Sequence, residues 1–75
     1  MKYTVLSWDG VEGTTVTSCL TPGSAAKRAV EELGFRPGMI VVVDELGERR
    51  MFDVHATRLV YVSEVEWDFQ RGEKR

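Results

Sequence analysis

The sequence predicts a small α+β domain of element order ββαβββ, with a single mixed or antiparallel sheet of about five strands and one amphipathic helix on one face. Three observations lead to this fold class. Short runs of aromatic and β-branched residues are bounded by turn residues, as in strands. One stretch repeats apolar residues at helical spacing. The chain has 75 residues, enough for one core but not for a second domain.

Two strands are expected to form an N-terminal hairpin. The run Tyr3–Trp8 is rich in aromatic and β-branched residues and ends at Asp9-Gly10, a strong turn signal. Threonines and valine then dominate Thr14–Leu20, and these residues favour a pleated strand over a helix. A strand, a short glycine-bearing loop and a second strand make a hairpin.

The helix has the clearest boundaries in the sequence. Thr21 can cap its N-terminus with a hydroxyl, and Pro22 fits the first helical position. Gly34 can take the left-handed conformation that follows a helix, which leaves Phe35 to pack back on the last turn. One face is apolar and therefore predicted to cover the sheet: Ala26, Ala29, Val30 and Leu33.

Three further strands are expected after the helix. The turn Arg36-Pro37-Gly38 leads into an apolar run of the kind found in strands buried on both faces. The last two strands are joined without Gly or Pro, so a single long strand bent by a bulge is an alternative. We assign residues 1–69 to the domain and expect residues 70–75, which are charged, to form a frayed tail. The expected strands are Met39–Asp44, Arg49–His55 and Leu59–Trp67.

In element order and length, this layout resembles the β-grasp arrangement of ubiquitin-like domains. The C-terminal residues Arg71–Arg75 lack the terminal Gly-Gly pair that a conjugated modifier of that class needs. The likeness concerns topology alone and implies no function. Other orders of the same strands in the sheet remain open.

Charge and cysteine content narrow the possible partners and compartment. Ten basic and twelve acidic residues give a net charge of -2, so there is no global attraction to nucleic acid or to an anionic membrane. The apolar run Tyr3–Trp8 is too short for a signal peptide or a membrane span. Cys19 is the one cysteine, which favours a reducing, cytoplasmic setting.

The distribution of apolar residues is the strongest indication of function. Met39, Val41 and Val43 would point to one side of their strand, and alternate residues to the other, yet one helix covers only one face. We therefore expect self-association as a homodimer, or binding of another protein, through an apolar sheet face. The alternative is a sheet that coils and buries both faces internally. The candidate interaction residues are Trp8, Ile40, Val42, Val60, Tyr61, Val62 and Trp67.

A second function class is weak nucleic-acid binding. Arg49 and Arg50 precede Phe52, a faint version of the alternation of basic and aromatic residues that binds single strands. Glu45, Glu48 and Asp53 in the same hairpin oppose it. The candidate contacts for this alternative are Arg36, Arg49, Arg50 and Arg58.

Enzymatic chemistry has little support in the sequence. Cys19 and His55, oriented by Asp53, are the one possible thiol and imidazole pair, and they would have to lie within hydrogen-bond reach. Structural zinc prefers four Cys or His ligands, whereas the chain has two such residues. The glycines form no phosphate-binding motif. We expect a non-enzymatic protein without cofactor or metal.

Overall fold

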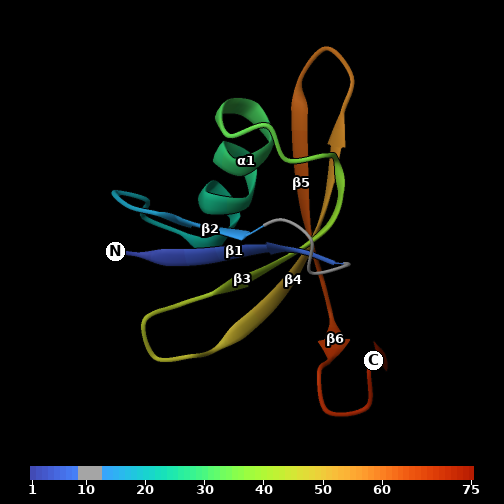
Figure 1. Cartoon of the computed structure of the whole chain (residues 1–75). Helices are drawn as coiled ribbons and strands as arrows, with labels where there is room; N and C mark the ends of the chain where they lie inside the picture. Colours follow the sequence, from blue (N-terminus) through green and yellow to red (C-terminus); the bar gives the residue numbers. More distant parts are fainter. Residues whose placement is uncertain (9–12) are drawn as a thin grey trace.

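The computed structural model describes residues 1–8 and 13–75. Within them the chain forms an α+β fold in which one helix packs against a five-stranded sheet, and a small β-hairpin follows (Figure 1). The predicted fold class is confirmed. The elements are β1 (Tyr3–Ser7), β2 (Gly13–Val16), α1 (Pro22–Glu32), β3 (Gly38–Val43), β4 (Arg49–Ala56), β5 (Val60–Val65), β6 (Trp67–Asp68) and β7 (Glu73–Lys74).

The strands of the sheet lie in the order β2-β1-β3-β4-β5, and every neighbouring pair is antiparallel. The first strand therefore lies between β2 and β3. The β-grasp arrangement, in which the first and last strands are parallel neighbours, is not formed. After α1 the chain enters β3, which lies beside β1 on the side away from β2. Because β3 runs antiparallel to β1, the whole sheet is antiparallel.

The predicted boundaries of the helix are confirmed. The Thr21 side chain accepts a hydrogen bond from the Ser24 backbone N–H at 3.1 Å, and Pro22 opens the first turn. At the other end Gly34 has a φ of +79°, a left-handed conformation that glycine adopts without steric cost. The Phe35 N–H then donates to the Ala29 carbonyl, and its ring is buried in the core.

The main core lies between α1 and the sheet. Three alanines, Ala25, Ala26 and Ala29, let the helix approach the strands closely. The strands supply the larger side chains, and cross-strand partners share a face, so these residues form one layer under the helix. That layer consists of Tyr3, Val5, Val16, Ile40, Val42, Phe52 and Val54, with Val30, Val60 and Val62 at its margin.

Three strands are shorter than predicted: β1, β2 and β5. The strand β2 ends at Val16 because Ser18 takes a positive φ of 63°, which turns the chain so that Cys19 enters the core. The strands β4 and β5 pair as a hairpin closed by a hydrogen bond from the Thr57 N–H to the Leu59 carbonyl. A single long bent strand is therefore not formed. The predicted turn at Asp9-Gly10 lies outside the described residues.

The C-terminal segment is paired rather than frayed. The chain leaves the sheet after Val65, and β6 then pairs with β7 in a second, two-stranded sheet (Figure 1). Asp68 fixes the turn, since its Oδ1 accepts hydrogen bonds from the N–H groups of Gln70 and Arg71. We call residues 67–74 the C-terminal hairpin.

Candidate interaction surface

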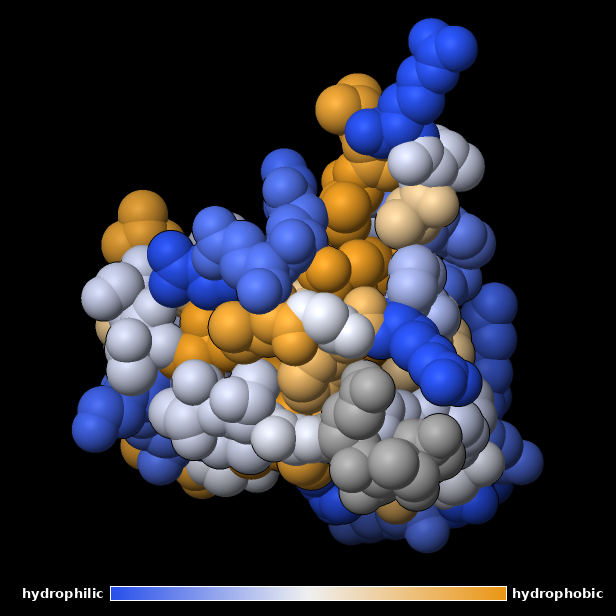
Figure 2. Space-filling view, turned by 45° about the horizontal axis from the view of Figure 1, so that its top comes forward, coloured by the Kyte–Doolittle hydropathy of each residue, from blue (hydrophilic) through white to orange (hydrophobic). Residues whose placement is uncertain are grey.

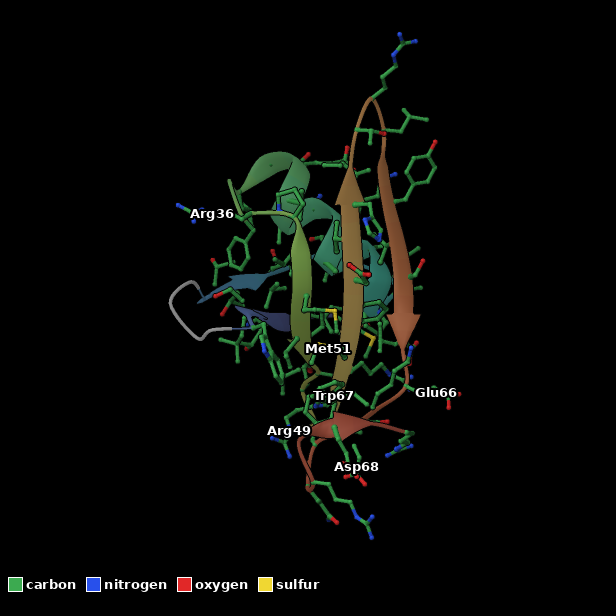
Figure 3. All side chains as sticks on the ribbon, turned by 90° about the vertical axis from the view of Figure 1, so that its right-hand side faces the viewer. Arg36, Arg49, Met51, Glu66, Trp67 and Asp68 are labelled. Atoms are coloured by element: carbon green, nitrogen blue, oxygen red, sulfur yellow. The ribbon has the colours of Figure 1, made fainter. Side chains whose placement is uncertain are left out.

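The sheet face opposite α1 carries an apolar row across four strands. The register aligns Leu6 with Val41, Val41 with Met51, and Met51 with Val65. Met51 is only 1 % exposed, although no described helix lies on its side of the sheet. The C-terminal hairpin supplies the cover, and Figure 3 shows Trp67 beside Met51 with α1 behind the sheet. Part of the second apolar face is therefore closed within the chain.

Aromatic side chains surround the part of this face that stays open. The rings of Trp8 and Trp67 meet edge to face, with centroids 5.0 Å apart and planes at 80°. The guanidinium carbon of Arg49 lies 4.8 Å from the centre of the Phe69 ring. Trp8 remains 52 % exposed. We call this surface the aromatic patch; it consists of Leu6, Trp8, Val41, Arg49, Trp67 and Phe69.

Two hollows that are lined by both Arg49 and Phe69 adjoin the aromatic patch. One, of about 250 Å³, lies between β1 and the C-terminal hairpin, and its lining is mostly apolar: Leu6, Ser7, Trp8, Val41, Arg49 and Phe69. The other, also about 250 Å³, lies at the end of β4 and β5, and Arg49, Trp67 and Phe69 line it together with charged residues. Its charged lining residues are Glu48, Arg50, Glu64, Glu66 and Arg75.

The charges beside the aromatic patch fall into two groups. Arg50 donates to both Glu64, at 3.1 Å, and Glu48, at 3.4 Å, so these three side chains neutralise one another largely within the chain. Among the described residues, neither Arg49 nor Glu66 forms an ion pair. Arg36 and Arg75, which line hollows beside the patch, also form none, so several unpaired cations and the unpaired Glu66 carboxylate border this apolar surface in the part of the chain that the structure describes.

The predicted interaction residues divide between the two faces of the sheet. Trp8 and Trp67, which lie far apart in the sequence, meet at the aromatic patch. Ile40 and Val42 are wrong as surface residues, because each is 1 % exposed in the core under α1. Tyr61 is 57 % exposed but pairs with His55 in the β4–β5 hairpin, at the other end of β4 from Arg49.

Val60 and Val62 belong to the helix side. Both are half-buried at the margin of the main core, together with Val30. Figure 2 shows apolar side chains reaching the surface as a strip on the side of α1 and the β4–β5 hairpin, flanked by polar residues. These valines complete the packing of the helix on the edge of the sheet. They lie on the opposite face from the aromatic patch.

Four residues of the aromatic patch are not among the predicted interaction residues: Leu6, Val41, Arg49 and Phe69. Phe69 reaches the patch because the chain leaves the five-stranded sheet after Val65 and forms the C-terminal hairpin, a departure that no Gly or Pro marks at Glu66. Arg49 reaches it from the start of β4, on the same face of the sheet as Met51. One signal was present. Val65, Trp67 and Phe69 alternate with Glu66 and Asp68, so a single apolar face continues past the predicted end of the last strand.

The four arginines of the nucleic-acid alternative do not converge. Arg49 opens β4 and stacks on Phe69, whereas Arg58 lies in the loop at the other end of that strand. Arg50 is held by Glu48 and Glu64. Arg36 precedes β3 and lines a separate hollow with Trp8, Pro37 and Met39, far from Arg49 in Figure 3.

The possible thiol and imidazole pair is separated by the sheet. Cys19 is buried in the core under α1. His55 follows core residue Val54 along β4, so its side chain lies on the other face, where its Nε2 is 3.2 Å from Asp53 Oδ2. Within the described part of the chain, no group of His, Cys, Asp and Glu is suited to hold a metal ion.

The comparisons with known proteins give no relative. No protein-family model matches the chain, and no curated protein or solved structure is similar to it at a significant level. No helix in the described residues is long and apolar enough to cross a membrane. Function is therefore inferred from the residues of the aromatic patch themselves.

Proposed function

We propose that this protein is a small non-enzymatic interaction module that self-associates through the aromatic patch. The observation that carries the proposal is the exposure of Trp8, whose ring lies half open to solvent beside Trp67 on an apolar sheet face. Leu6 is also exposed on this face. Burial of this apolar surface against a second copy would remove it from water, which is favourable.

The composition of the aromatic patch fits a protein partner. Trp and Arg are the residues most enriched where interfaces hold most of their binding energy, and the patch contains two tryptophans and Arg49. Arg49 is stacked on Phe69, so its guanidinium is already oriented before binding. A surface organised in this way loses less side-chain entropy on association.

Nucleic acid is the less supported partner. A strand of phosphates requires clustered positive charge, whereas the charged hollow beside the patch contains Glu48, Glu64 and Glu66 as well as arginines. The net charge of -2 adds to this repulsion. Mixed charge instead suits a surface that must match a second copy of itself.

The test is the concentration dependence of the solution mass for Trp8→Ala. If Trp8 is a central contact, its removal costs about 2 kcal/mol of association energy, or about a 30-fold weaker dimer. Leu46→Ala is the matched control, because Leu46 is 93 % exposed in the β3–β4 turn and lies outside the patch. Equal dimerisation of the native chain and Trp8→Ala would contradict the proposal.

A further inference from the structure

We infer that the two copies meet around a two-fold axis beside Trp67, held by reciprocal ion pairs between Arg49 of one copy and Glu66 of the other. This inference rests on the proposed self-association and specifies its geometry. The starting observation is that Arg49 and Glu66 border one hollow with Trp67, and that neither forms an ion pair among the described residues.

The positions of the two charges suit an exchange between copies. Figure 3 looks onto the face that carries the aromatic patch, and in this view Arg49 and Glu66 lie on opposite sides of Trp67. A two-fold axis that passes between Arg49 and Glu66 places the Arg49 side of one patch against the Glu66 side of the patch on the second copy. Arg49 then faces Glu66 of the second copy, and the same contact forms twice.

Glu66 is the one carboxylate lining the hollows beside the patch that forms no ion pair among the described residues, whereas three of the lining cations form none: Arg36, Arg49 and Arg75. Arg50 is occupied by Glu48 and Glu64, and Asp68 is near Arg71 at 4.0 Å. Among the unpaired cations Arg49 is the one whose guanidinium is oriented by stacking on Phe69, and it lies across Trp67 from Glu66. A guanidinium that stacks on an aromatic ring through its face keeps its N–H edges available for a carboxylate.

A charge-swap experiment tests this geometry. In Arg49→Glu, each dimer would hold two contacts between like charges, and Glu66→Arg has the same effect with the opposite sign. We expect each variant alone to dimerise about tenfold more weakly than the native chain. An equimolar mixture of the two variants restores both attractive contacts, so its association should return to about the native value.

Controls separate this effect from general damage. Arg58→Glu makes the same charge change at the far end of β4 and should leave the association unchanged. Thermal unfolding of each variant shows whether the fold is intact. Misfolded variants would not regain dimerisation when mixed. Recovery would therefore show that Arg49, retained in one variant, pairs with Glu66, retained in the other.

The outcomes distinguish this inference from the proposed function. Weak single variants and a recovered mixture support the reciprocal pairs. A native dimer that is unaffected by both swaps, or swaps that the mixture does not repair, would overturn the pairs while self-association stands. A native chain that stays monomeric at every concentration would overturn both.

Discussion

The ring of Trp67 meets the ring of Trp8 edge to face at 5.0 Å, and this contact joins the C-terminal hairpin to the first strand. Because of it, a chain with one helix covers part of its second apolar sheet face. Met51 becomes a core residue on that side, while Trp8 and Leu6 remain accessible. The same contact thus stabilises the fold and shapes the surface that we propose as the interface.

The coupling of the two tryptophans is measurable. In a double-mutant cycle with Trp8→Ala and Trp67→Ala, unfolding of the monomer should show a coupling free energy of about 0.5 to 1.5 kcal/mol. Chemical denaturation at a concentration below association provides the four free energies. Purely additive effects would show that the rings do not interact in solution.

The C-terminal hairpin should make Met51 a costly residue to truncate. Met51→Ala creates a cavity at a site that is 1 % exposed, and we expect a loss of about 2 to 5 kcal/mol in the free energy of unfolding. Met39 lies in β3, on the same face of the sheet, and is half-buried. Met39→Ala is therefore the control and should lower the free energy of unfolding by less. If both variants lose the same stability, the hairpin does not cover Met51.

Two glycines in and after α1 should respond to alanine in opposite directions. Gly23 lies within the helix, where an added Cβ would stand 3.7 Å from Phe52 in ordinary contact, so Gly23→Ala should stabilise the chain by up to about 1 kcal/mol. Gly34 has a left-handed φ of +79°, and Gly34→Ala should destabilise it by about 1 kcal/mol. Thermal unfolding of both variants checks the signs, and a gain in stability for Gly34→Ala would contradict the helix ending described above.

The thiol of Cys19 should be protected in the native state. It is buried in the core under α1, and His55 lies on the other face of the sheet. Labelling with a chromogenic disulfide reagent should be slow in native buffer and rapid in denaturant. Prompt labelling of the native chain would contradict the burial of Cys19 and reopen the question of thiol chemistry.

Local signals were enough to predict the fold class. Thr21, Pro22 and Gly34 mark the helix because capping depends on neighbouring residues alone. The order of the strands depends on contacts between distant residues, which no local signal encodes, and the β-grasp likeness was therefore misleading about β1. For the candidate site, the sequence picked out Trp8 and Trp67 but placed Ile40 and Val42 with them. Alternation along a strand reveals two faces, but it does not say which face the helix covers.

Sedimentation equilibrium of the native chain over a wide range of concentrations tests self-association most directly. We predict a mass that rises from one chain toward two chains and then levels off, as a closed two-fold dimer requires. A mass that stays at that of one chain, 8.5 kDa, at all concentrations would contradict the proposal.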